Sequence, residues 1–155
     1  MKRKKIKWTV VTVLFVLFMY SQSMLPATVS SGESTYALGV VGNFFSSIGL
    51  KFIALTEHII RKSAHFIEYT IYGVLLLNTI SIHGFIGLNK WLLVILFGIA
   101  VPFIDETIQL FVPGRSGQIT DVWLDMSGVL AGICIVTVFL MIRRRFTGRT
   151  VREEM

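Results

Sequence analysis

Charged residues are scarce in this sequence and make up only 15% of its 155 residues. An ordinary soluble domain carries about 25%. Hydrophobic residues reach 54%, and the mean hydropathy is +0.71. This excess of apolar residues excludes a typical soluble domain and indicates a membrane protein.

Cysteine is almost absent, since Cys134 is the only one. No intramolecular disulfide can form, and there is no cysteine cluster for zinc. The 15 basic residues outnumber the 9 acidic ones. They gather at the chain ends beside apolar runs, which argues against a nucleic-acid partner. Internal repeats and low-complexity segments are also lacking, and we expect a single domain over residues 1–155.

What the sequence does have is four long apolar runs, at about residues 8–25, 64–82, 91–112 and 122–142. Each is long enough to cross a bilayer, which needs about 20 residues of helix. A helix suits this role because all its backbone hydrogen bonds are internal. We therefore predict an all-α integral membrane bundle with four transmembrane helices in contact with bilayer lipid. Residues 143–155 are expected to form a tail.

Residues 26–61 separate the first two runs and are rich in glycine and serine. A helix lying in the membrane interface, in the first outer loop, is the favoured interpretation. A re-entrant segment is the alternative. The basic start and short apolar core of the chain also fit a signal peptide. A retained helix is favoured because no clean small-x-small cleavage site is present, and Met24, Leu25 and Pro26 follow directly.

Lysine and arginine predict the orientation of the helices. Five basic residues lie within residues 2–7, five lie within residues 143–152, and Lys90 sits between the second and third runs. Under the positive-inside rule these segments are cytoplasmic. The sequence therefore predicts a multi-pass plasma-membrane protein with both termini and the tail in the cytoplasm.

Polar side chains gather at the predicted outer ends of three spans. A charge facing lipid there costs at least about 2.5 kcal/mol, so such groups must face the bundle, a partner or water. Their convergence is a functional-site hypothesis by default, and we predict an outer-face pocket. Its expected ligand-binding residues are Lys62, His65, Asp105, Glu106, Gln109, Arg115, Asp121 and Asp125.

Helical spacing adds detail to this pocket. His65 and Glu68 are three residues apart and share a face. Asp105 and the adjacent Glu106 point about 100° apart, so they cannot both point fully into one centre. Asp125 leads along its face to Gly128 and Gly132, a small-xxx-small pair that permits close helix packing and would bury Asp125.

Several of these residues also have plainer interpretations. Asp121 is placed to cap the last helix. Arg115, in the turn "PGRSG", could form an ion pair with Glu106 or Asp121. Arg61 is expected to be solvated or interfacial.

Several motifs occur together in this order. They are Lys62, His65 and Phe66; Asp105, Glu106 and Gln109; Pro113, Gly114 and Arg115; and Asp121, Asp125 and Gly128. The chain resembles the VanZ-like family of small bacterial membrane proteins in these motifs, over roughly residues 8–140. The resemblance implies the same fold and a bacterial membrane location. The family's namesake is associated with teicoplanin resistance. Asp125 departs from the asparagine that the family often has.

Binding of an anionic cell-envelope ligand is the leading functional prediction, with a contribution to glycopeptide (teicoplanin) resistance or envelope homeostasis. An anionic lipid or a lipid-linked wall precursor would fit, with Lys62 and Arg115 holding phosphate or carboxylate. The alternative is a membrane-embedded hydrolase or transferase acting on a lipid-linked envelope substrate. Its candidate catalytic residues are His65, Glu68 and Asp105, although no nucleophile is evident.

Two further functions are less favoured. His65, Glu68, Asp105 and Asp125 offer mixed nitrogen and oxygen ligands, but their spacing matches no specific metal signature. We therefore predict no metal and no cofactor. Transport would need polar groups in the cytoplasmic half of the bundle, and the sequence offers few.

Overall fold

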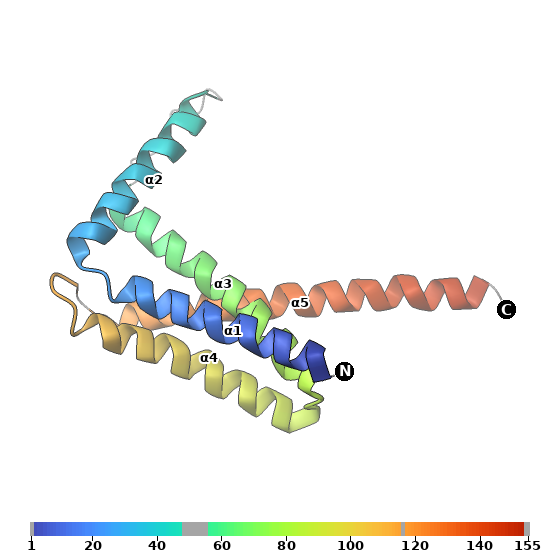
Figure 1. The fold of residues 1–155 in the computed structure, drawn as a ribbon. Helices are drawn as coiled ribbons and strands as arrows, with labels where there is room; N and C mark the ends of the chain where they lie inside the picture. The colour runs from blue at the N-terminus through green and yellow to red at the C-terminus, as the bar shows by residue number, and fades with distance from the viewer. Residues whose placement is uncertain (1, 48–55, 116, 154–155) are drawn as a thin grey trace.

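The computed structural model describes residues 2–47, 56–115 and 117–153, and over these residues it contains five helices and no strand (Figure 1). The helices are α1 (Lys2–Ser23), α2 (Ala27–Ser47), α3 (Glu57–His83), α4 (Gly87–Gln109) and α5 (Ile119–Glu153). The predicted all-α class is confirmed. Within the described part of the chain, three segments are long and apolar enough to cross a membrane: Lys2–Ser23, Gly87–Gln109 and Ile119–Arg143.

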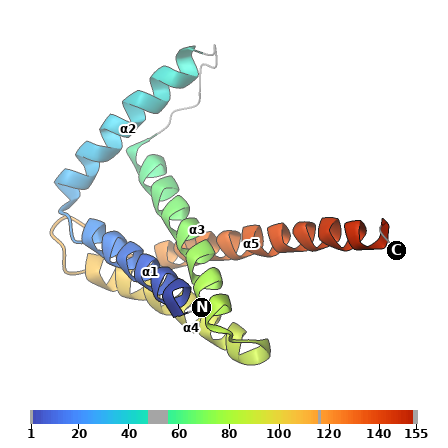
Figure 2. The same cartoon turned by 45° about the vertical axis from the view of Figure 1, so that its right-hand side comes forward.

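Helix α3 is the centre of the bundle and packs against each of the other four helices. Its buried face, with Tyr69, Tyr72 and Leu76, meets Met19 of α1 and Val129 of α5 in one apolar cluster. Figures 1 and 2 show α2 and the carboxy-terminal half of α5 projecting away from this bundle. The packed part of the molecule is therefore formed by α1, α3, α4 and the first half of α5.

The crossing of α3 and α5 depends on glycine. A Cβ built on Gly128 would lie 2.7 Å from the carbonyl oxygen of Phe66, and one on Gly132 would overlap the carbonyl oxygen of Thr70. Gly73 on α3 faces the backbone of Val129 in the same way. The small-xxx-small interpretation of α5 is thus confirmed. Its consequence is also confirmed, because Asp125, one turn before Gly128, is 0% exposed.

Helix α3 begins well before the predicted start at residue 64. Thr56 is its N-cap, and the Thr56 hydroxyl accepts a hydrogen bond from the backbone N–H of Ile59 at 3.3 Å. Gly84 ends the helix with a φ of 91°, a left-handed conformation that glycine adopts without strain. The polar residues between Glu57 and Ala64 are therefore part of the helix, so their side chains are distributed around it at about 100° per residue.

Helix α1 is packed into the bundle by polar contacts as well as apolar ones. The Tyr20 hydroxyl donates to the carbonyl oxygen of Val101 at 3.3 Å. The hydroxyls of Thr12 and Thr79 are 2.7 Å apart. These contacts tie α1 to α4 and α3.

The remaining segments differ from the predicted boundaries in specific ways. Helix α4 ends at Gln109 rather than at residue 112. The backbone N–H groups of Phe111 and Val112 bond three residues back, and the chain then turns at Gly114, whose φ is 77°. Helix α5 continues to Glu153, so the predicted tail is helical within the described residues. Much of the segment assigned to an interfacial helix is α2, while residues 48–55 lie outside the described residues.

Candidate functional site

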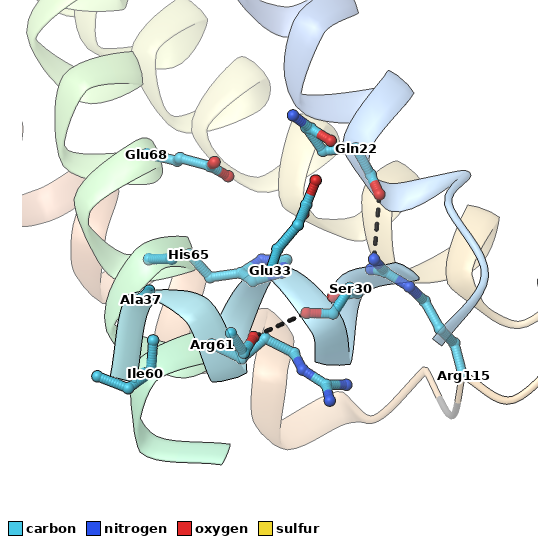
Figure 3. Close-up of a pocket in the computed structure, with 11 residues that line it drawn as sticks. Gln22, Ser30, Glu33, Ala37, Ile60, Arg61, His65, Glu68 and Arg115 are labelled. Atoms are coloured by element: carbon cyan, nitrogen blue, oxygen red, sulfur yellow. Dashed lines mark hydrogen bonds between the residues drawn. The ribbon is translucent and has the colours of Figure 1, made fainter. Parts of the chain in front are cut away.

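A cavity of about 200 Å³ opens between α1, α2 and α3 at the end of the bundle nearest the 113–115 turn. Its polar lining includes Glu33 from α2, Arg61, His65 and Glu68 from α3, and Arg115 from the turn. Figure 3 shows Gln22 and Arg115 on one side, Glu68 and His65 on the other, and Glu33 reaching between them. Helices α1, α2 and α3 and the turn therefore meet around one polar space.

A second cavity, of about 100 Å³, lies between α3, α5 and the same turn. Arg61, His65 and Arg115 line both cavities. The second cavity also reaches Lys62, Glu106, Gln118, Asp121 and Asp125. The two arginines and the histidine thus form a shared wall between two polar spaces.

Arg61, which was expected to be solvated or interfacial, is only partly exposed and reaches α2. One terminal nitrogen, Nη2, donates to the hydroxyl of Ser31 on α2 at 3.3 Å. Its Nε is buried and has no hydrogen-bond partner among the described residues. A buried guanidinium donor without a partner beside a cavity is well placed to bind an acceptor.

Arg115 holds the end of α1. Its Nε donates to the carbonyl oxygen of Leu25 at 2.9 Å, and its Nη2 donates to that of Gln22 at 3.1 Å. A cation at a helix carboxy terminus satisfies free carbonyls and complements the helix dipole. Burial first, and the nearby guanidinium of Arg61 second, lower the pKa of Arg115 from its usual value, while nearby acids act in the opposite direction.

The ion pairs suggested for Arg115 are replaced by other contacts. Lys62 Nζ lies 2.8 Å from Asp121 Oδ1, which joins α3 to α5. Glu106 Oε2 accepts the backbone N–H of Gln118 at 3.0 Å, which fixes the turn. Asp121 is not the helix cap, because α5 begins at Ile119 and Asp121 lies in its first turn. An acid there still favours the helix dipole.

His65, Asp105 and Asp125 converge below the two cavities. Each offers one ligand atom, and these atoms all lie within 4.8 Å of one another. His65 Nδ1 lies 3.7 Å from Asp125 Oδ1, which is too far for a hydrogen bond. Asp105 and Asp125 are 1% and 0% exposed. Three of the four possible metal ligands in the sequence therefore meet, and Glu68 lines the first cavity instead.

Asp105 and Glu106 share Gln109 as a partner but otherwise reach different groups, as their angular separation predicted. Gln109 Nε2 lies 3.4 Å from Asp105 Oδ2 and 3.3 Å from Glu106 Oε1. Asp105 joins the His65 cluster, whereas Glu106 accepts a hydrogen bond from Gln118, just after the 113–115 turn. Gln109 thus links the buried acids to the turn.

Tyr69 and Glu33 are site residues that the sequence did not single out. Tyr69 is 0% exposed, and its ring stacks on His65 with centroids 6.5 Å apart. Periodicity could have indicated it, since it lies four residues after His65 on α3. Nothing in the sequence pointed to Glu33, because its place depends on how α2 packs against α3.

The two cavities are lined by both cations and carboxylates, and two acids at or beside them are fully buried. Arg61, Lys62 and Arg115, which can be called the mouth of the site, lie near the 113–115 turn, and Asp105 and Asp125, its floor, are buried. Cys134 lies farther along α5, is exposed, and does not line either cavity. Such a site can hold an anion by hydrogen bonds from the mouth and can position a proton or a cation at the floor.

A family model described as VanZ/LLP1 matches residues 7–140 of the chain. The match includes every residue that lines the two cavities. Comparison with curated proteins and with solved structures finds no match.

Proposed function

This chain belongs to the VanZ/LLP1 family, and from that premise we propose that it binds an anionic cell-envelope ligand in the cavity between α1, α2 and α3. Its apolar helices make it a membrane protein. The proposed location is the bacterial plasma membrane, with the whole chain acting as one domain. The ligand-binding face is the outer one.

The proposed topology has four spans, with α3 joining the three more apolar helices. Helix α3 has 27 residues, and a span needs about 20. Its polar residues are concentrated near its start, and its later part carries the apolar core residues Tyr72, Leu76 and Leu77. Helix α2 then lies at the outer interface, and both chain termini are cytoplasmic, as the basic residues favour.

Cysteine labelling tests this topology. In a Cys134→Ser background, Thr120→Cys is expected to react with a membrane-impermeant maleimide added to intact cells. Asn89→Cys is expected to react only after the membrane is permeabilised. Both positions are exposed and lie near the start of a helix. Labelling of Asn89→Cys in intact cells, with Thr120→Cys protected, would invert the proposed orientation.

The unpartnered Nε of Arg61 is the observation that carries the binding proposal. Arg61 shares both cavities with Arg115, and the two guanidinium groups are close enough for Arg61 to lower the pKa of Arg115. Two cations held together repel each other, and an anion between them removes that repulsion. Guanidinium groups also present planar donors that match phosphate and carboxylate oxygens.

The ligand class follows from the position of these cations. They lie where a lipid headgroup at the outer leaflet would be found under the proposed topology. Phosphate on an anionic phospholipid or on a lipid-linked wall precursor has the required charge and oxygen acceptors. Binding of a wall precursor would also provide a route to glycopeptide (teicoplanin) resistance, because those drugs act on wall assembly.

Replacing Arg61 with glutamine tests the binding proposal. A hydrogen bond to a charged group contributes about 1.5–3 kcal/mol, so Arg61→Gln is expected to weaken binding by roughly 10- to 150-fold. The measurement is titration of detergent-purified protein with short-chain phosphatidylglycerol by calorimetry. Inorganic phosphate is titrated in parallel, and a lipid ligand is expected to bind more tightly than the free ion.

Lys90→Gln is the matched control for Arg61→Gln. It removes the same charge at the opposite end of the bundle, beside Trp91, and away from both cavities. Its affinity for phosphatidylglycerol is expected to equal that of the unchanged protein. An equal loss in both variants would mean that general charge, rather than this cavity, attracts the lipid. Unchanged affinity in Arg61→Gln would refute the proposed site.

A further inference from the structure

The carboxylates at the floor of the site have oxygens without partners. Asp105 Oδ1 and both side-chain oxygens of Asp125 are buried and have no hydrogen-bond partner among the described residues. The hydroxyl of Tyr69, also fully buried, has none either. These groups surround His65, whose Nδ1 is 3.7 Å from Asp125 Oδ1. Buried polar atoms are nearly always paired, so this cluster calls for a physical explanation.

Electrostatics makes the cluster more unusual. If both buried carboxylates were ionised beside a neutral imidazole, they would place two negative charges in an enclosed space. Burial of unpaired charge is strongly unfavourable. Lys62 pairs with Asp121 and Arg115 bonds to carbonyls of α1, and among the described residues neither Asp105 nor Asp125 forms a salt bridge with a lysine or an arginine. A doubly charged cation at this point would cancel the local charge.

We propose that His65, Asp105 and Asp125 bind a divalent transition-metal ion, with zinc or manganese as the expected ion. One imidazole with two carboxylates is a mixed donor set that suits these ions. Two metal–ligand bonds of about 2.1 Å span at most about 4.2 Å. The ligand atoms here lie within 4.8 Å of one another, so small side-chain movements bring all three into range.

Neighbouring side chains are placed to support such an ion. Gln109 Nε2 approaches Asp105 Oδ2 at 3.4 Å, leaving Oδ1 of the same carboxylate free to ligate. The ring of Tyr69 lies beside that of His65, with centroids 6.5 Å apart and an interplanar angle of 19°. Outer groups that orient ligating carboxylates and histidines are a regular feature of metal sites. The open side of the ion would face the cavity that Asp125 and His65 line.

The metal site adjoins the anion site, since His65 lines both cavities, but the groups that would hold the two ligands are different. The three ligands come from α3, α4 and α5, and none of them is an arginine or lysine of the mouth. A metal could bind whether or not a lipid does. The metal alone is therefore the probe, and failure of lipid binding would leave this proposal intact.

The test uses the full chain in detergent after treatment with a chelator and removal of the chelator. Calorimetric titration with Zn²⁺ and with Mn²⁺ is expected to show one ion per chain for at least one of them. At a concentration 100-fold above Kd, the ion is expected to raise the thermal unfolding midpoint by roughly 5–10 °C. Asp125→Asn and His65→Gln, made separately, are each expected to weaken binding at least about 100-fold.

Glu57→Gln is the control, because Glu57 is an exposed acid at the start of α3 whose carboxylate accepts from Thr35 at 2.8 Å. Its metal affinity is expected to be unchanged. In chelator, Asp125→Asn is expected to unfold at or above the midpoint of the unchanged protein, because a buried charge is removed. Absence of Zn²⁺ and Mn²⁺ binding by the unchanged protein would overturn the proposal. The proposal would also be overturned if metal stabilised Asp125→Asn or His65→Gln as much as it stabilises the unchanged protein. One of these variants that folds is enough for the test.

Discussion

Replacing Gly132 with leucine is expected to disrupt the packing of α3 against α5 and to destabilise the whole bundle. A Cβ at this position would overlap the carbonyl oxygen of Thr70 and lie 2.8 Å from the backbone nitrogen of Val74. Neither atom can rotate away, because both belong to the backbone of α3. We expect a loss of about 3 kcal/mol or more in unfolding free energy. The measurement is the thermal unfolding midpoint of detergent-purified protein, together with the yield of monodisperse material.

Gly39→Leu is the matched control for this change. Gly39 lies within α2 and is exposed, and a Cβ added to it would have no atom within 4 Å. The same side chain is added to a helix interior, where leucine is about 0.8 kcal/mol more favourable than glycine. Its midpoint is expected to equal or exceed that of the unchanged protein. A normal midpoint for Gly132→Leu would show that α3 and α5 do not cross at these glycines.

The glycine contact explains why part of the site could be predicted from sequence. The spacing of Asp125, Gly128 and Gly132 on one helix face is a local property, and it predicts both close packing and burial of the acid. The observed crossing has both features. The separation of Asp105 from Glu106 likewise follows from helical geometry alone.

Arg61 was missed because of the predicted start of α3. Beginning that helix at residue 64 leaves Arg61 in a loop, where an arginine is expected to be solvated. With Thr56 as the N-cap, Arg61, His65 and Glu68 are spaced i, i+4 and i+7, and thus share one face. The sequence shows the charge of Arg61. It did not show which face of the helix carries this residue, because the polar first turns of α3 were assigned to the loop before the apolar run.

Contacts between distant segments could not be predicted in this way. Arg115 is 90 residues from Leu25 and 93 from Gln22, and their carbonyl oxygens are backbone atoms that any residue carries. The sequence offered acids as the evident partners for an arginine. In the structure, the packing of α1 against α4 places carbonyl oxygens at the end of α1 beside the turn. The partners of Arg115 therefore depend on how these helices pack.

Arg115→Gln is expected to cause the second-largest loss of stability. Two hydrogen bonds from a charged donor to the end of α1 would be removed, each contributing about 1.5–3 kcal/mol at most. Because Arg115 is only partly buried, we expect a net loss of about 2–4 kcal/mol. The turn would be loosened from α1, although the backbone N–H of Ala27 would still reach the carbonyl oxygen of Pro113 at 3.4 Å. Thermal unfolding of the purified protein provides the measurement.

Lys62→Gln is the control for Arg115→Gln, because it removes one positive charge from the same end of the molecule. It breaks only the partly exposed ion pair with Asp121, which is worth about 1 kcal/mol or less. Arg115→Lys keeps the charge but cannot reach both carbonyls with a planar fork, so an intermediate loss is expected. Equal midpoints for Arg115→Gln and Lys62→Gln would show that the contacts to α1 contribute little.

The two arginines therefore need separate interpretation. A loss of lipid binding in Arg115→Gln would not by itself identify an anion contact, since the same change releases α1 and alters both cavities. Arg61 has a single weak contact to α2 at 3.3 Å and an unpartnered Nε. Its replacement is expected to change stability little while removing a donor from the cavity. A fall in affinity without a fall in unfolding midpoint is thus the signature that separates recognition from folding, and Arg61 is the residue at which it can be observed.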